Sequence, residues 1–232
     1  MTNELCARVS AIRQALESAS FERWGRVPEL VAVSKTVEPA RINALRQAGV
    51  ARLGENRVQE LLEKLPHLDA DFQIDLIGRL QSNKVKYIID KVDRIQSLDR
   101  ESLAQEIDRR AQQRGVRMPV LVQVNIGSEP QKGGVEVCDL FDFVRYAAKL
   151  PGLEVRGLMA VMPDIDDQEQ LRPYFRRMRT LFEQLREEAV AGTAISDLSM
   201  GMSGDYLLAA QEGATIVRIG SAIFGSRAPA GL

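Results

Sequence analysis

The sequence predicts an α/β fold, a single-domain (β/α)₈ TIM barrel with an extra N-terminal helix. Three observations favour this class. Eight short apolar segments rich in Val, Ile and Leu alternate with helix-like segments after Leu30. The length of 232 residues is ordinary for one barrel domain. No proline- or glycine-rich linker interrupts the chain, so one domain is expected over 1–232. An open doubly wound sheet is the alternative, because the number of strands does not prove closure.

The elements follow in order along the chain. A helix is expected over 1–20, because apolar residues recur there on one helical face. The barrel is expected over 30–227. Its strands are expected at 30–33, 51–53, 74–77, 93–96, 120–124, 154–158, 196–198 and 215–218. Its helices are expected from Glu38-Pro39 to before Gly49, and at 56–65, 82–91, 100–114, 136–149, 167–190 and 203–212.

Composition and charge limit the classes of function. A net charge of -1 gives no general attraction to nucleic acid or to an anionic membrane, and neither is expected as a partner. No apolar run approaches the roughly 20 residues of a membrane span, and no targeting signal opens the chain. Cys6 and Cys138 stand alone, which favours a reducing, cytoplasmic compartment and no metal site. The single histidine, His67, disfavours the triads, dyads and zinc motifs of most hydrolases.

Isolated polar residues gather where the predicted strands end, and barrels place their active sites there. The sharpest is Lys35, directly after four apolar strand residues. Burial lowers the pKa of a lysine, and a partly neutral amine can form an imine with an aldehyde. The alternative is a lysine that reaches from the rim into solvent and has no chemical role. Position alone does not decide between the two.

The last two strand ends predict a phosphate site. Barrels commonly bind phosphate with the loops after strands seven and eight and with a helix N-terminus. Strand seven leads into 199–205, with two glycines and two hydroxyls, and strand eight into 218–221. The alternative is two ordinary helix N-caps, with Ser203 as one of them. A lysine and a phosphate site on one rim indicate a phosphorylated carbonyl compound, either a Schiff-base aldolase substrate or pyridoxal 5′-phosphate (PLP) itself.

Five segments stand out together by sequence and spacing. They are Val31-Ala32-Val33-Ser34-Lys35-Thr36, Gly54-Glu55-Asn56 with Gln59-Glu60, Ile77-Gly78 with Leu80-Gln81-Ser82-Asn83-Lys84, Leu198-Ser199-Met200-Gly201-Met202-Ser203, and Val217-Arg218-Ile219-Gly220-Ser221-Ala222-Ile223-Phe224-Gly225. In this order, from about Leu30 to Arg227, they resemble the motifs of the pyridoxal phosphate homeostasis proteins, the YggS/PROSC family. Several independent motifs at consistent spacing make the resemblance specific.

The resemblance implies a fold-type III PLP barrel, related to the N-terminal domain of alanine racemase. It implies that Lys35 holds PLP as a Schiff base, with Asn56 beside the cofactor. It implies that Arg218 faces the pyridine nitrogen and keeps it unprotonated, which disfavours carbanion chemistry. The residues implied to hold the phosphate are Ser199, Met200, Gly201, Ser203, Gly220 and Ser221.

Two departures from the family pattern stand out. The family usually has Trp-His before the Phe-Ile-Gly of its third motif, and here the run is Ile74-Asp75-Leu76-Ile77-Gly78. The tyrosine common after Gly-Glu-Asn is replaced by Arg57. Any contact that the histidine makes with the site in relatives has to be made differently here.

The leading hypothesis is a protein that stores, buffers or delivers PLP without turnover, with no catalytic residue assigned. The alternatives are a PLP-dependent racemase or decarboxylase of amino acids, and a cofactor-free Schiff-base aldolase. Racemases of this type have a second, C-terminal β domain that supplies a tyrosine, and this chain ends soon after strand eight. That difference favours the carrier and a monomer. Tyr206 is the one tyrosine beside the phosphate segment. Other B6 vitamers and transient contacts with PLP-dependent apoenzymes are expected.

Overall fold

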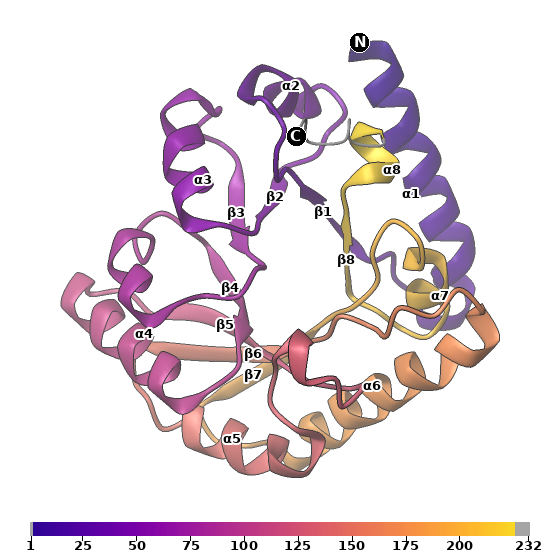
Figure 1. The fold of residues 1–232 in the computed structure, drawn as a ribbon. Coiled ribbons are helices and arrows are strands. Elements are labelled where there is room, and N and C mark those ends of the chain that lie inside the picture. The colour runs from indigo at the N-terminus through magenta and orange to yellow at the C-terminus, as the bar shows by residue number, and fades with distance from the viewer. Residues whose placement is uncertain (1, 226–232) are drawn as a thin grey trace.

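The chain forms a closed barrel of parallel strands surrounded by helices (Figure 1). The computed structural model describes residues 2–225. The strands are β1 (Glu29–Val33), β2 (Arg52–Glu55), β3 (Gln73–Leu76), β4 (Arg94–Leu98), β5 (Met118–Gln123), β6 (Leu153–Met159), β7 (Thr193–Ser199) and β8 (Ile216–Ile219). Each strand pairs with the next, and β8 pairs with β1. The sheet has no free edge, which confirms the predicted barrel and excludes the open sheet.

Helices connect the strands, and one precedes them. They are α1 (Thr2–Trp24), α2 (Pro39–Asn43), α3 (Val58–Lys64), α4 (Glu101–Arg114), α5 (Leu140–Ala147), α6 (Gln168–Glu188), α7 (Tyr206–Gln211) and α8 (Ser221–Phe224). Short 3-10 segments are η1 (Ala44–Arg46), η2 (Leu65–His67), η3 (Ser82–Tyr87), η4 (Pro130–Lys132) and η5 (Val137–Asp139). Within 2–225, no helix is both long and apolar enough to cross a membrane. The last residues of the expected barrel range, 226 and 227, lie outside the described residues.

Several expected helices are shorter than predicted, with α2 and α5 each joined to a 3-10 segment and the largest departures over 82–91 and 203–212. Over 82–91 the structure has only the 3-10 segment η3, which contains Asn83 and the β-branched Val85, both weak helix formers. Over 203–212 the helix begins only at Tyr206, because the preceding residues form a loop that contacts the end of β8. The prediction of helix over the whole of both segments is wrong.

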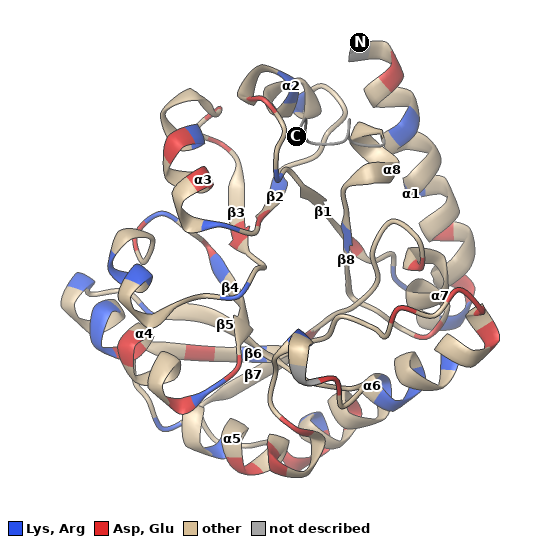
Figure 2. Cartoon of the chain, viewed as in Figure 1, with Lys and Arg blue, Asp and Glu red and all other residues tan. Residues whose placement is uncertain are grey.

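The barrel interior holds apolar and charged side chains. Val31, Leu121, Met159 and Ile216 form a small apolar cluster, separate from the main core. Successive side chains in a strand point to opposite faces, so Arg218 lies on the same face of β8 as Ile216. Figure 2 shows charged residues on strands as well as on helices. The interior is therefore a place where polar groups can be held away from water.

Helix α1 covers the seam between the last and first β/α units. It contacts η1 after β1, and α7 and α8 after β7 and β8 (Figure 1). Its buried residues Leu5, Val9, Ile12 and Leu16 join the main core. The extra helix thus supports the two segments in which the phosphate residues are expected.

Candidate functional site

Lys35 lies in a tight turn directly after β1. The residue is half-buried, and the next one, Thr36, has φ 62°, in the left-handed region that non-glycine residues seldom adopt. In β1, Val31 points into the barrel, and Lys35 follows the C-terminal end of this strand by two residues. The turn therefore sets Lys35 at the C-terminal mouth of the barrel.

A buried cluster of charged residues holds this turn from behind. The Lys64 ammonium, on α3, donates to the Ser34 carbonyl at 2.7 Å, to Glu55 Oε1 at 3.1 Å and to Glu60 Oε1 at 2.5 Å. The Ser34 hydroxyl donates to Glu55 Oε1 at 2.6 Å, and the Thr36 N–H donates to Glu60. Ser34 and Thr36, on either side of Lys35, are thus both held by hydrogen bonds. Sequence reasoning missed this cluster, although Glu60 and Lys64 stand at the i, i+4 spacing of a helical ion pair.

The two carboxyl groups of the cluster differ in their electrostatics. Burial raises the pKa of Glu55, and the hydrogen bond from Ser34 and the charge of Lys64 oppose this only in part. Glu55 Oε2 is buried and accepts no hydrogen bond from the described residues. Burial would also raise the pKa of Glu60, but hydrogen bonds from Lys64 and Thr36 outweigh it and lower that pKa. Glu55 is therefore the member of the cluster that takes up a proton most readily.

Arg218 is a buried cation near the C-terminal end of β8. Its side chain donates from Nη1 to Ser199 Oγ at 2.6 Å and from Nη2 to the Ala160 carbonyl at 2.8 Å. Desolvation lowers the pKa of its guanidinium to about 10, with the nearby charge of Asp205 opposing the shift. The group stays protonated at neutral pH, although both of these acceptors are neutral.

The loop after β7 folds over the end of β8. The Ser203 hydroxyl accepts hydrogen bonds from the backbone N–H groups of Gly220 at 3.2 Å and Ala222 at 3.3 Å. Ser203 therefore does not cap α7, contrary to the N-cap alternative. Gly201 has φ 94°, and a Cβ there would lie 2.5 Å from Ala209 Cβ, so only glycine lets the loop pass so close to α7. The result is a hydroxyl and two backbone N–H groups gathered at one point, the types of group that bind phosphate oxygens, with the N–H groups here donating to the hydroxyl oxygen.

The other predicted phosphate residues are placed differently. The Ser199 side chain is fully buried inside the barrel and bonded to Arg218, so its hydroxyl is not among the groups at Ser203. The Met200 side chain is part of the main core, and only its backbone lies in the loop. Ser221 is exposed at the start of α8.

Pairing between β1 and β8 places the lysine turn beside the phosphate segment. Ala32 pairs with Ile219, so the residues that follow in each strand, toward Lys35 and Gly220, leave the sheet side by side. A Cβ on Gly220 would lie 3.3 Å from the Val33 carbonyl, which shows how closely the two segments approach.

Asn56 and Tyr206 flank this region. Asn56 follows β2 and is half-buried, and its carbonyl oxygen would lie 2.2 Å from a Cβ on Gly78, so the ends of β2 and β3 meet in backbone contact. Tyr206 begins α7 and packs, partly buried, against the main core. Packing accounts for this tyrosine.

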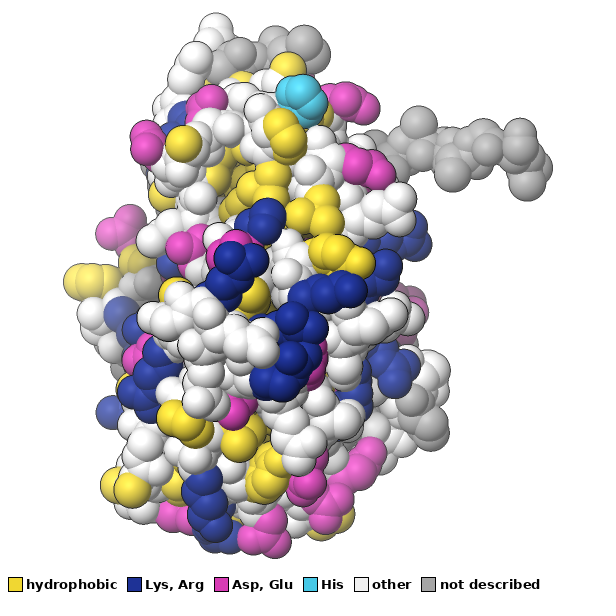
Figure 3. All heavy atoms as spheres, turned by 90° about the vertical axis from the view of Figure 1, so that its left-hand side faces the viewer, with side chains coloured by type: hydrophobic (Ala, Val, Ile, Leu, Met, Phe, Trp, Pro, Cys, Tyr) yellow, Lys and Arg dark blue, Asp and Glu magenta, His cyan; other side chains and the backbone are white. Residues whose placement is uncertain are grey.

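The third motif contributes exposed basic residues. Arg79 is exposed, with Nε 3.9 Å from Asp99 Oδ2. In η3, the Lys84 and Lys86 ammonium groups lie 5.8 and 4.9 Å from the ring centroid of Tyr87, which is 44% exposed. Figure 3 shows the side of the molecule that carries α3 and α4, with basic side chains gathered across its middle. This segment is a surface feature.

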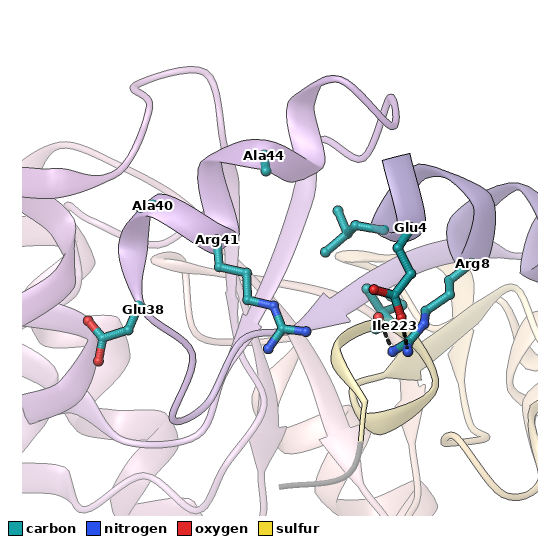
Figure 4. A pocket seen from close by; sticks show the side chains of 8 residues that line it. Glu4, Arg8, Glu38, Ala40, Arg41, Ala44 and Ile223 are labelled. Carbon is teal, nitrogen blue, oxygen red and sulfur yellow. Dashed lines mark hydrogen bonds and ion pairs between the residues drawn. The ribbon is translucent and has the colours of Figure 1, made fainter. Parts of the chain in front are cut away.

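A separate cavity of about 360 Å³ lies between α1, α2 and α8 (Figure 4). Arg8 donates to the Ile223 carbonyl at 3.3 Å and Arg41 to the Phe224 carbonyl. Two guanidinium groups thus hold the C-terminal carbonyls of α8, on the side away from the loop of Ser203. The cavity contributes to the site only by fixing this short helix.

Comparison with known proteins places the chain. The family model for the alanine racemase N-terminal domain matches residues 9–228. A pyridoxal phosphate homeostasis protein of Aquifex aeolicus is 45% identical over 226 residues, which cover 96% of this chain and 98% of that protein. The chain belongs to the family of pyridoxal phosphate homeostasis proteins. This confirms the resemblance seen in the sequence motifs.

Solved structures agree with the family assignment. PipY of Synechococcus elongatus, with PLP bound, has a TM-score of 0.83 at 32% identity, over 95% of this chain and all (100%) of that chain. An alanine racemase of Clostridium difficile has a TM-score of 0.76 at 16% identity, over 98% of this chain and 60% of that chain. At this identity, the second likeness shows a shared fold only.

Proposed function

We propose that this protein binds PLP as a Schiff base on Lys35 and acts in PLP homeostasis, holding and delivering the cofactor without turnover of its own. The observation that carries the proposal is the pairing of β1 with β8, which brings the turn of Lys35 beside the donors of Gly220 and Ser203. An aldehyde carbon and a phosphate on one small molecule match these two neighbouring groups. PipY, a family member, is known with PLP bound, which supports the same cofactor here.

The residues of the chain fit this group. The Ser203 hydroxyl proton is one donor for a phosphate, and the N–H groups of Gly220 and Ala222 would be two more on exchanging the Ser203 oxygen, which accepts from both in this structure, for a phosphate oxygen. Gly201 and the backbone of Met200 shape the loop. We propose that Arg218 lies against the pyridine nitrogen, with Asn56 beside the ring. The assignment of Ser199 and Ser221 to the phosphate is the weakest of the set, because one side chain is turned into the barrel and the other faces solvent.

Arg218 supports the proposed absence of turnover. When bound, PLP supplies an electron sink for reactions at an amino-acid α-carbon, and that sink is weaker when its pyridine nitrogen is unprotonated. A guanidinium that stays charged at neutral pH donates a hydrogen bond but does not give up its proton. A racemase also needs acid/base groups on both faces of the substrate. Tyr206, the tyrosine nearest the phosphate segment, is engaged in packing.

The proposal extends to location and partners. The free Cys6 and Cys138 suit a reducing cytoplasmic compartment. Other B6 vitamers that carry the phosphate would use the same donors. Hand-over to PLP-dependent apoenzymes would involve transient contacts at the mouth of a monomer.

The test is the visible absorbance of the protein mixed with PLP, followed by borohydride reduction and peptide mapping. The expected result is an absorbance band of lysine-bound PLP and a reduced adduct on Lys35. Lys35→Ala should lose the band, and Lys84→Ala, an exposed lysine of η3, should keep it. Amino-acid turnover by the loaded protein should be absent. A protein that gains no absorbance with PLP would refute the proposal and return attention to a phosphorylated aldehyde substrate.

A further inference from the structure

A continuous chain of hydrogen bonds runs through the barrel from Arg218 toward the opposite end. Arg218 Nη1 donates to Ser199 Oγ at 2.6 Å, Ser199 Oγ donates to Gln96 Oε1 at 2.7 Å, and Gln96 Nε2 donates to Asp75 Oδ2 at 2.6 Å. The residues come from β8, β7, β4 and β3, and all four are buried. Bonds this short in the interior of a protein are strong and polarise one another.

The donor-to-acceptor direction of these hydrogen bonds is fixed by the two residues at the ends of the series, Arg218 and Asp75. A guanidinium can only donate, and an ionised carboxylate can only accept. Ser199 must therefore turn its proton toward Gln96, and Gln96 must present its NH₂ group to Asp75. Neither intermediate group can reverse without leaving a buried polar atom unpaired, which carries a penalty of about 1 to 3 kcal/mol in general.

Asp75 belongs to a cluster of charged side chains at the N-terminal end of the barrel. Arg94 donates to Oδ2 from Nε at 3.0 Å and from Nη2 at 2.6 Å, and Arg52 donates to Oδ1 at 2.7 Å. Arg94 also reaches Glu29 at 3.1 Å and Asp197 at 2.9 Å. Burial alone would lower the pKa of Arg94, but these carboxylates outweigh it and raise that pKa.

The charge of the cluster around Asp75 and the charge of Arg218 complement each other. The cluster has three carboxylates and two guanidinium groups, and its surplus is negative. Arg218 is the cation at the other end of the chain, bonded there to neutral groups. Asp75 stands where the family motif usually has histidine, so a carboxylate at this position is a feature of this chain.

We propose that Asp75, Gln96 and Ser199 are positioning residues that orient Arg218 toward the pyridine ring and balance its charge through the barrel interior. This inference rests on the proposed role of Arg218 in PLP binding. The three residues act through Arg218, and the Ser199 hydroxyl, expected from sequence at the phosphate, bonds Arg218 and Gln96 instead. Removing the hydrogen bonds of Gln96 by substitution leaves Arg218 in place but removes the group that fixes the Ser199 hydroxyl.

The first arm of the test uses the cofactor-free protein. Gln96→Met keeps the length of the side chain and removes both hydrogen bonds. Gln123→Met is the matched control, because Gln123 is also buried but donates to the Lys132 carbonyl, outside the chain. Nitrogen-15 NMR of the arginine guanidinium groups should show a slowly exchanging Arg218 signal, assigned with Arg218→Lys. We expect this signal to shift and exchange faster in Gln96→Met and to stay unchanged in Gln123→Met.

The second arm measures PLP affinity and the absorbance maximum of the loaded protein. Gln96→Met should weaken PLP binding about tenfold, equivalent to ~1.4 kcal/mol, and shift the maximum. Ser199→Ala should do the same, whereas Ser199→Thr, which keeps the hydroxyl, should restore both values. If Gln96→Met does not fold, the comparison of Ser199→Ala with Ser199→Thr tests the positioning role.

The two arms separate the two proposals. An Arg218 signal that is the same in Gln96→Met, Ser199→Ala and the parent protein overturns the positioning role, whatever happens to PLP. A parent protein that binds no PLP refutes the proposed function, while the NMR arm still decides whether the chain orients Arg218. Equal loss in Gln96→Met and Gln123→Met would assign the effect to general loosening of the core and would also overturn the inference.

Discussion

Replacement of Lys64 by methionine tests the cluster behind the cofactor lysine. The substitution keeps the aliphatic stem and removes the hydrogen bonds to the Ser34 carbonyl, Glu55 and Glu60. Removing one partner of a buried ion pair typically destabilises a protein by about 3 to 5 kcal/mol. Glu60 keeps some exposure and Glu55 can take up a proton, so we expect the lower end, ~3 kcal/mol, at pH 8.

The loss should depend on pH in a defined direction. Burial raises the pKa of Glu55 in the folded protein. At a pH above the unfolded pKa of this group, ionised Glu55 therefore disfavours the folded state. Without Lys64, an attraction that opposes this shift is gone, and the pKa rises further. A group with a raised folded pKa contributes stability at low pH that is lost as the pH rises through that value. The substitution should therefore be milder at pH 5, at about 1 kcal/mol, than at pH 8.

The assay is urea unfolding followed by circular dichroism at both pH values. Lys91→Met is the control, since Lys91 pairs with Asp90 at the surface and should change the unfolding free energy by less than about 1 kcal/mol. Combining Lys64→Met with Glu55→Gln should remove most of the pH dependence of the loss. A loss that is equal at pH 5 and pH 8 would refute the assignment of Glu55 as the titrating group.

Two further predictions concern packing and a buried carboxylate paired with two arginines. Gly78→Ala should lower the unfolding midpoint by about 6 to 12 °C in calorimetry, because its Cβ would meet the Asn56 carbonyl at 2.2 Å, and an unchanged midpoint would contradict this. Burial would raise the pKa of Glu212, but hydrogen bonds from Arg172 and Arg176 outweigh it, so that pKa is lowered and its stabilisation is lost as the pH falls through it. Glu212→Gln should destabilise by about 2 kcal/mol at pH 7 in urea and by clearly less at pH 3.5, whereas a constant difference would count against the ion pairs.

The strands were predictable because a parallel barrel buries both of their faces. A continuous apolar run as short and Val-rich as Leu30-Val31-Ala32-Val33 favours a fully buried strand over a helix, and the observed β1 contains this run. Helix limits were less predictable. Ser203 looks like an N-cap in sequence, but its hydroxyl binds groups that follow it by 17 and 19 residues, which only the closed barrel brings near. Local propensity cannot report such a contact.

The series of hydrogen bonds from Arg218 to Asp75 inside the barrel could not be predicted, for the same reason. Ser199 and Gln96 are 103 residues apart, and they meet because strands on different sides of the barrel point side chains at one axis. In sequence, Asp75 registers only as a departure from the family motif. The pattern singled out Lys35 because it follows an apolar strand, and the family resemblance implied a role for Arg218, but neither gave a sign of what holds these two side chains.

The placement of α1 has a consequence for synthesis of the chain on the ribosome. The first helix made packs against α7 and α8, which are among the last segments to emerge. At usual elongation rates its apolar face waits on the order of ten seconds or more for these partners. Until then the helix that carries Leu5, Val9, Ile12 and Leu16 has its contact with η1 but lacks those with α7 and α8. Newly made protein should therefore acquire protease resistance in one late step, after α8 has left the exit tunnel.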